Sequence, residues 1–228
     1  MSKIVLPLSR RAMMIAATTV ASGLALTGSR AFAQRKVGAD ADVTELMKAG
    51  DLPDLAIGAA DAKITVVEYA SMTCGHCATF HKKVFPGLKA KYVDNGKVRF
   101  ILREFPLDDL AAAASMLSRC AGGTGNVAKS YDLTGILFEK QEDWAFAKGN
   151  PVPRLFEIAK QAGFTQESFD KCLTDQKLLE QITANRERGS KTFGVNSTPT
   201  FFINGKRLAD GPSTEAFEKA FDAILKAS

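Results

Sequence analysis

The tetrapeptide Cys74-Gly75-His76-Cys77 lies between a strand pattern and a helix pattern, and this placement restricts the fold more than any other feature of the sequence. Residues 64–69 before it alternate as in a strand, and the apolar residues after it recur at helical spacing. The first cysteine is therefore expected at a helix N-terminus, where unpaired backbone N–H groups and the helix dipole favour a thiolate. We expect a dithiol that closes and opens as a disulfide, with the His76 imidazole adding to the stabilisation of the Cys74 thiolate.

Two other interpretations of the cysteine pair remain open on sequence grounds alone. Cys74, His76, Cys77 and His81 could be zinc ligands, but the spacing is not that of a finger and no second Cys or His pair follows. The two cysteines could also be inert core residues, although Gly-His between them at a helix start is an unusual way to fill a core. We favour the redox pair and expect neither a metal nor an organic cofactor, because the two sulfurs hold the electrons.

Composition places the chain among ordinary globular proteins. It has 228 residues, of which 46% are hydrophobic and 24% are charged, enough for one large domain or two intimate ones. Four of the basic residues lie in the first 33 positions, which contain no Asp or Glu, so the net charge of +5 falls to +1 for the remainder. The sequence therefore predicts no basic face for nucleic acid.

Residues 1–33 have the pattern of an export signal peptide. The motif Ser9-Arg10-Arg11 precedes an apolar run from Ala12 to Leu26, and Ala31-Phe32-Ala33 is a suitable cleavage site. The paired arginines favour the twin-arginine route. Retention as a membrane anchor is the alternative, but the run is shorter than the roughly 20 residues of a spanning helix. We expect export to the periplasm, where disulfides persist.

The rest of the chain divides by its periodicity. Residues 34–60 have no sustained period and predict an arm with one short helix near residues 43–48. Strands are predicted at 64–69 and 97–105, on either side of a helix over 75–93 that is kinked by Pro86. After residue 194 the strand pattern returns, with a hairpin at Asn204-Gly205 and a last helix capped by Ser213.

Residues 107–189 differ from both flanks, because their apolar spacing is helical throughout. Five helices are predicted there: 110–120, 127–140, 154–161, 166–173 and 177–188, with Thr165 as the cap of the fourth. The sequence therefore predicts an α/β protein whose strand-containing part, residues 61–106 and 190–228, is interrupted by an all-helical insertion domain.

This order of elements resembles the DsbA family of exported thiol-disulfide oxidoreductases over roughly residues 63–228. The resemblance is carried by Glu68, by Cys74-Gly75-His76-Cys77, and by Thr198-Pro199 followed by Thr200-Phe201-Phe202-Ile203-Asn204-Gly205. It implies a thioredoxin fold with a helical insertion and a cis peptide bond at Thr198-Pro199. It also implies that Cys74 exchanges with the substrate and that Cys77 resolves the mixed disulfide.

Other residues of the site can be interpreted on physical grounds. Glu68 falls on the apolar face of its strand, so we expect a buried acid that relays a proton to or from Cys77, rather than a carboxylate that reaches solvent at a strand end. Thr198 and Pro199 would offer backbone groups to an extended substrate chain. His81 is interpreted as a surface histidine with no role.

Cys120 and Cys172 are expected to form a second, structural disulfide. Both fall on predicted helices of the insertion, and an exported protein rarely keeps two spare thiols. The alternative is a pair of unpaired buried cysteines, since connectivity cannot be read from sequence.

The expected function is that of a monomeric oxidase that donates the Cys74-Cys77 disulfide to unfolded or reduced secreted proteins. The resemblance implies reoxidation by a membrane-bound, quinone-linked partner. An isomerase or reductase is the main alternative, because Gly75-His76 also occurs in eukaryotic protein disulfide isomerases and Thr198 occurs in isomerases of the same fold. A redox-silent peptide-binding chaperone is the alternative from another class.

Overall fold

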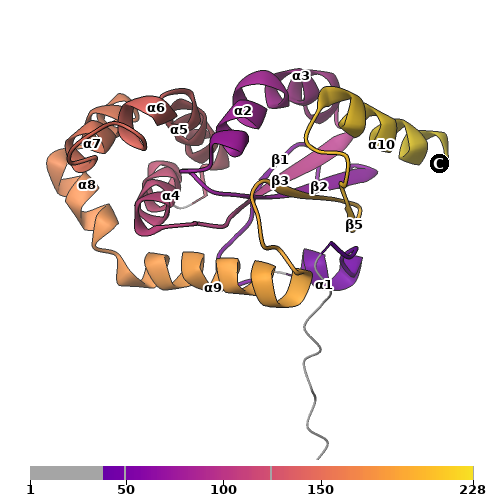
Figure 1. Ribbon diagram of the computed structural model, residues 1–228, viewed down its shortest axis with the longest axis horizontal. Helices are drawn as coiled ribbons and strands as arrows, with labels where there is room; N and C mark the ends of the chain where they lie inside the picture. Colours follow the sequence, from indigo (N-terminus) through magenta and orange to yellow (C-terminus); the bar gives the residue numbers. More distant parts are fainter. Residues whose placement is uncertain (1–37, 49, 124, 228) are drawn as a thin grey trace, which may run out of the picture. The chain divides into compact units, whose positions relative to one another are not determined.

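The computed structural model describes residues 38–48, 50–123 and 125–227 (Figure 1). The expected signal peptide at residues 1–33 and the start of the arm lie outside these ranges. Within the described ranges no helix is both long enough and apolar enough to cross a bilayer. The fold is α/β, with five strands and helices on both faces of the sheet, as the sequence predicts.

The strands form one mixed sheet in the order β1-β3-β2-β4-β5. The central strands β2 and β3 are parallel, and the pairs β1/β3, β2/β4 and β4/β5 are antiparallel. The strand bounds are β1 Leu55–Ile57, β2 Ile64–Ala70, β3 Val98–Glu104, β4 Thr200–Ile203 and β5 Lys206–Arg207. Because β2 and β3 are covered on both faces, they are buried along nearly their whole length, as parallel strands usually are.

The two faces of the sheet carry two separate apolar clusters. The side chains on one face of the sheet, among them Val66, Phe100 and Phe201, pack against helices α2, α3 and α10. The side chains on the opposite face, among them Val67 and Phe202, pack against α1 and the end of α9. The bounds are α1 Val43–Met47, α2 Gly75–Lys83, α3 Phe85–Leu88, the π-helix η1 Lys89–Val93, and α10 Thr214–Lys226, capped by Ser213.

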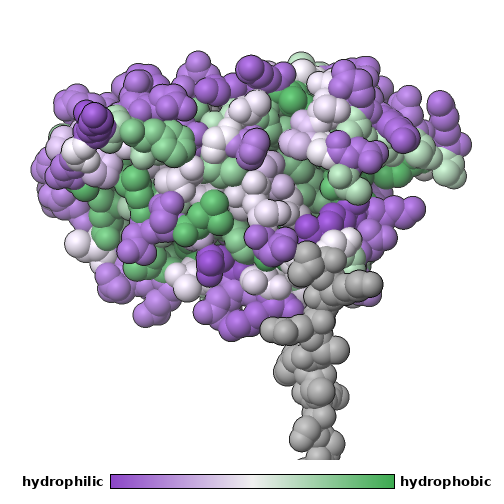
Figure 2. Space-filling model, in the orientation of Figure 1, coloured by the Kyte–Doolittle hydropathy of each residue, from purple (hydrophilic) through white to green (hydrophobic). Residues whose placement is uncertain are grey.

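The insertion is helical, as predicted, and it contains one more helix than the sequence indicates. Its helices are α4 Asp109–Gly122, α5 Val127–Glu139, α6 Gln141–Trp144, α7 Val152–Gln161, α8 Gln166–Leu173 and α9 Gln176–Phe193. The additional helix is α6, a single turn too short to show a period. Thr165 caps α8 in a capping box with Ser168. In Figure 2 polar side chains cover the outer helices, and apolar side chains gather between these helices and α9, as expected of amphipathic helices around a core.

Helix α9 is longer than predicted and reaches from the insertion back under the sheet. It runs to Phe193 and ends at Gly194, which has a left-handed conformation with φ 65°. A Cβ on Gly189 would lie 2.8 Å from the ring of Tyr69, so the glycine lets the helix approach the strand. The last turns of α9 therefore belong to the core of the strand-containing part.

The helix predicted over residues 75–93 is divided into α2, α3 and η1. The break lies at Val84, two residues before Pro86, which takes a place in the first turn of α3. A proline in that turn loses no intrahelical hydrogen bond, whereas in the middle of one long helix it would. The prediction of a single kinked helix is therefore wrong.

The arm is part of the sheet domain, contrary to the boundary predicted at residue 61. Its helix α1 lies where we predicted a short helix, but β1 was not predicted, and it pairs with β3 through Leu55 and Leu102. The hairpin between β4 and β5 also holds the arm, since the N–H of Ala41 donates to the carbonyl of Gly205 at 2.7 Å. Gly205 has φ 84°, and a Cβ there would clash with Ala41 and Val43.

Candidate active site

The cysteine motif lies where the sequence predicts it, at the start of a helix that follows the central strand β2. Cys74 is the N-cap of α2 and has an extended backbone, with φ −86° and ψ 115°. No side chain caps the helix there, so the first N–H groups of α2 are free to face the sulfur of Cys74. Cys74 and Cys77 are both free thiols, so the structure describes the dithiol form.

The environment of Cys74 stabilises its thiolate and lowers its pKa to about 5, from an ordinary value of 9.0. The largest cause is the hydrogen bond from the Cys77 thiol, and burial of the sulfur opposes it. The Thr198 hydroxyl and the backbone N–H groups of Cys77 and His76 lower the pKa further. The hydroxyl of Thr198 is buried and has no hydrogen-bond partner among the described residues, which leaves it available to the sulfur. At neutral pH Cys74 is therefore a thiolate.

The environment of Cys77 has the opposite effect, because it raises the pKa of this thiol. Its side chain is fully buried, and this burial raises its pKa well above the ordinary value. The hydrogen bond that Cys77 donates to Cys74 and the negative charge of Glu68 raise the pKa further. The two cysteines therefore share one proton at neutral pH, and that proton stays on Cys77.

Glu68 is buried, as expected from its place on the apolar face of β2. Its exposed fraction is 0%, so the alternative in which its carboxylate reaches solvent is excluded. One carboxylate oxygen, Oε2, lies 2.9 Å from Nε2 of His81. The other, Oε1, is buried and has no hydrogen-bond partner among the described residues.

The interpretation of His81 as a surface histidine is wrong. Its exposed fraction is 8%, its ring stacks on Phe138 of α5 at 4.5 Å between centroids, and its Nε2 pairs with Glu68. A signal in the sequence could have shown this. His81 follows Cys77 by four positions, so it lies on the same face of α2 and faces the same strand.

His76 is at the motif, but its ring points to solvent. The residue is exposed, and its identified contribution to the pKa of Cys74 is the hydrogen bond from its backbone N–H. The role expected for the imidazole therefore stays a prediction.

Thr198 and Pro199 lie beside the dithiol, although they are 124 residues away from it in the chain. The Thr198-Pro199 peptide bond is cis, as the resemblance implies. Sγ of Cys74 lies 3.2 Å from the Thr198 carbonyl oxygen, which accepts a hydrogen bond from this sulfur when it is protonated. Thr198 and Pro199 are half-buried, so backbone groups next to the reactive sulfur border solvent.

The sequence did not predict a contact between the insertion and the residues that precede α2. Gln141, the first residue of α6, is buried, and its Nε2 donates to the carbonyls of Met72 at 2.7 Å and Cys74 at 3.1 Å. The insertion therefore fixes the backbone that precedes α2. No local pattern marks this glutamine, because its partners are 67 and 69 residues away.

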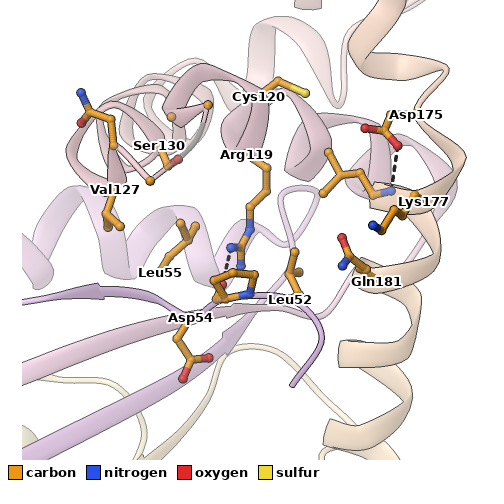
Figure 3. A pocket seen from close by; sticks show the side chains of 16 residues that line it. Leu52, Asp54, Leu55, Arg119, Cys120, Val127, Ser130, Asp175, Lys177 and Gln181 are labelled. Carbon is orange, nitrogen blue, oxygen red and sulfur yellow. Dashed lines mark hydrogen bonds between the residues drawn. The ribbon is translucent and has the colours of Figure 1, made fainter. Parts of the chain in front are cut away.

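Cys120 and Cys172 are joined in a disulfide between α4 and α8, the pairing expected from the sequence. A cavity of about 440 Å³ lies next to it, lined by residues such as Leu52, Arg119, Asn126 and Gln181 (Figure 3). The Arg119 guanidinium closes one wall by donating to the Pro53 carbonyl. The lining contains Cys120 but neither residue of the dithiol. We therefore place the reactive site at the dithiol and not in this cavity.

The chain is similar to known proteins over most of its length. The thioredoxin family model matches residues 51–223. A putative protein-disulfide oxidoreductase of Rickettsia bellii is 35% identical over 179 residues, which cover 78% of this chain and 67% of that protein. Across five Rickettsia relatives the matched part spans 60% to 67% of their length.

Solved structures extend the comparison. The crystal structure of Wolbachia pipientis alpha-DsbA1 superposes with a TM-score of 0.74 at 28% identity and covers 82% of this chain and 97% of that one. Oxidised BdbD from Bacillus subtilis has a TM-score of 0.68 at 21% identity over 83% of this chain and 98% of that one, a likeness of fold. Together with the dithiol at the start of α2, these matches show that the chain belongs to the DsbA-like thiol-disulfide oxidoreductases of the thioredoxin family.

Proposed function

We propose that the protein is an oxidase that donates the Cys74-Cys77 disulfide to unfolded or reduced secreted proteins. The observation that carries the proposal is the lowered pKa of Cys74, about 5, next to the raised pKa of Cys77. A stabilised thiolate lowers the free energy of the reduced enzyme, so its disulfide accepts electrons from ordinary protein thiols.

The exchange has two steps. A substrate thiolate attacks Sγ of Cys74 in the oxidised enzyme, the Cys74-Cys77 bond breaks, and Cys77 leaves and takes up a proton. A second substrate thiolate then attacks the substrate sulfur of the mixed disulfide, and Cys74 leaves as a thiolate. Its low pKa makes Cys74 a good leaving group. The substrate gains one disulfide, and the enzyme gains the two electrons.

Binding of an extended chain at the cis-proline loop fits this chemistry. The half-buried Thr198 and Pro199 lie beside Cys74, so a peptide that pairs with their backbone groups would bring its own sulfur to Cys74. Glu68, buried behind Cys77, would act as the proton acceptor and donor for that thiol.

The setting proposed for the activity follows from the start of the sequence and from the family resemblance. Residues 1–33 have the pattern of a signal peptide and favour export to the periplasm. The Cys120-Cys172 disulfide is typical of a protein in an oxidising compartment. A membrane-bound, quinone-linked protein would reoxidise the dithiol. We propose that the exported chain acts as a monomer and binds no nucleic acid.

Equilibration with glutathione and refolding assays test the direction of exchange. The expected result is a couple more oxidising than glutathione and rapid formation of disulfides in reduced, unfolded ribonuclease A. Replacement of either Cys74 or Cys77 by Ser should abolish this activity, because one cysteine alone forms no disulfide to donate. With oxidised glutathione, Cys77→Ser should accumulate a mixed disulfide at Cys74, because no second enzyme thiol resolves it.

Each rival predicts a different outcome. Rapid repair of scrambled ribonuclease with little net oxidation would reject the oxidase in favour of an isomerase. Full retention in Cys74→Ser of the ability to assist refolding would favour the redox-silent chaperone.

A further inference from the structure

The proton on Cys77 has no direct route to water. Resolution of a mixed disulfide requires Cys77 to lose this proton, and reduction of the enzyme returns it. Cys77 and Glu68 both have an exposed fraction of 0%, whereas His81 has 8%. Among these three groups, only the imidazole reaches the protein surface.

The three side chains form a sequence of contacts that leads outward. Cys77 lies one turn before His81 on the same face of α2, and His81 contacts Glu68, so the carboxylate faces the side of the helix that carries the thiol. The charge of Glu68 accordingly raises the pKa of Cys77. Its Oε1 has no hydrogen-bond partner among the described residues and can accept the proton, while Oε2 lies 2.9 Å from Nε2 of His81. An unpaired buried oxygen is costly, so its presence here points to a transient partner.

The ring of His81 is held in a fixed orientation. It stacks on Phe138 with 18° between the ring planes and contacts Phe80 edge-on and Phe85 at a tilt. These aromatic contacts come from α2, α3 and α5, and none of them competes for the ring nitrogens. The packing therefore directs one nitrogen at Glu68.

We propose that His81 is a positioning residue that orients Glu68 and carries the proton between its carboxylate and solvent. During resolution, Cys77 gives its proton to Oε1 of Glu68, and the carboxyl group turns so that this O–H faces Nε2 of His81. In the tautomer that carries its proton on the other ring nitrogen, Nε2 accepts the proton while that other nitrogen releases its own to water, so one proton leaves Cys77 and one reaches solvent. The Cys77 thiolate then attacks Cys74, and the partner sulfur leaves with the electron pair. During substrate oxidation the proton moves in the opposite direction.

Other charged groups near the pair are occupied. On the α5 side Tyr131 lies close enough to Glu68 for that charge to raise its pKa, together with the larger effect of burial. Its hydroxyl donates to the Leu55 carbonyl at 3.1 Å, and beyond it Glu104 is paired with Arg119. Cys77 is the titratable neighbour on α2. The ring of Phe85 from α3 contacts His81, and Phe201 of β4 is the cross-strand partner of Glu68, so both elements contribute apolar rings. Glu68 therefore exchanges protons with Cys77 and His81 alone among the groups that face it.

The test is the pH dependence of the resolving step, measured after the reduced protein attacks oxidised glutathione. His81→Gln keeps a donor for Glu68 but cannot accept a proton, and His81→Phe keeps the stacking on Phe138 but has no donor. General acid–base catalysis contributes about 10²- to 10⁴-fold, so we expect at least a 10-fold slower release of the second glutathione at pH 6 in both variants. At pH 9 the rates should approach the wild-type rate, because hydroxide is then abundant enough to remove the proton during the local openings that expose the thiol.

The first step serves as the internal control. Attack by the Cys74 thiolate on oxidised glutathione should keep its rate in both variants, because the pKa of Cys74 is lowered by groups of Cys77, Thr198 and His76 and not by His81. A purely structural role of His81 would slow resolution by the same factor at every pH, and that result, or a wild-type rate at pH 6 in His81→Gln, would overturn the proposal. If His81→Phe does not fold, His81→Gln decides the question.

Proton NMR gives an independent readout, because the chain contains two histidines. Glu68→Gln should change the chemical shifts of the His81 ring and leave those of the exposed His76 ring in place; an unchanged His81 signal would overturn the pairing. The proposal rests on dithiol exchange at this site, but resolution by Cys77 occurs in an oxidase, an isomerase and a reductase alike. A failed glutathione equilibrium would therefore reject the oxidase without affecting the relay.

Discussion

Cys74 and Cys77 are free cysteines with two residues between them in one helical turn, whereas Cys120 and Cys172 are bonded across 52 residues between two helices. In the chain-entropy model a bond across 52 residues restricts the unfolded chain by about 4 kcal/mol, and a bond within one turn by only about 2 kcal/mol. The first pair also gains free energy when it is open, because the Cys74 thiolate is stabilised. The position of each cysteine in the fold therefore separates a reactive pair from a structural one.

The groups around the two cysteine pairs also differ. The dithiol is surrounded by polar groups that act on protons: the Thr198 hydroxyl, the helix N–H groups and the carboxylate of Glu68. Cys172 and the dithiol both belong to the apolar cluster that includes Leu117 and Phe169, so the polar groups around the dithiol, and not the apolar packing, distinguish the two pairs. Three predictions test how far this difference extends.

Removal of the structural disulfide should have the largest effect on stability. The double variant Cys120→Ala/Cys172→Ala is expected to lose about 4 kcal/mol in free energy of unfolding, because the long loop in the unfolded chain is released. Urea unfolding of the oxidised proteins measures the loss. The matched control, Cys74→Ala/Cys77→Ala, should lose much less. Equal losses for the two pairs would show that both bonds serve stability and would remove the distinction.

The reduced protein should gain stability with pH in a range where the oxidised protein does not. The folded pKa of Cys74 is about 5 and its ordinary value is 9.0, so between these values the unfolded chain holds a proton that the folded chain lacks. Stability then rises with pH and is lost as the pH falls through about 5. The gain from pH 5 to pH 7 is about 2 kcal/mol, at about 1.4 kcal/mol per unit well above the folded pKa.

Urea unfolding of the two redox forms at several pH values checks this linkage. Cys77 stays protonated in the folded and unfolded chains over this range, since its folded pKa is raised, so it adds no slope. A Cys74→Ser/Cys77→Ser variant should follow the oxidised protein. Parallel curves for reduced and oxidised wild type would contradict the stabilised thiolate.

Features set by local sequence could be predicted, and features set by long-range pairing could not. The strands β2, β3 and β4, the Asn204-Gly205 hairpin and the caps at Thr165 and Ser213 follow from period and turn chemistry. The strand β1 was missed, because three residues have no measurable period and their pairing depends on β3.

The same division holds within the site. The cysteine motif and the buried Glu68 could be located from local spacing, because each depends on its own strand or turn. Gln141 could not, since only the folded insertion brings it to the carbonyls of Met72 and Cys74. His81 lies between these cases: its spacing from Cys77 was informative, but its pairing with Glu68 required the packing of α2 on β2.

The smallest expected effect concerns His76, and it tests whether the ring or the backbone of the turn sets the pKa of Cys74. The ring is exposed, so water screens its charge, and His76→Ala should raise this pKa by less than about one unit. His76→Pro also removes the backbone N–H that lowers the pKa, and a proline is tolerated in the first turn of a helix. The rise should therefore be larger in His76→Pro, and each unit would make the couple less oxidising by about 30 mV. Thiolate absorbance against pH measures both variants, and an equal rise in the two would assign the effect to the imidazole.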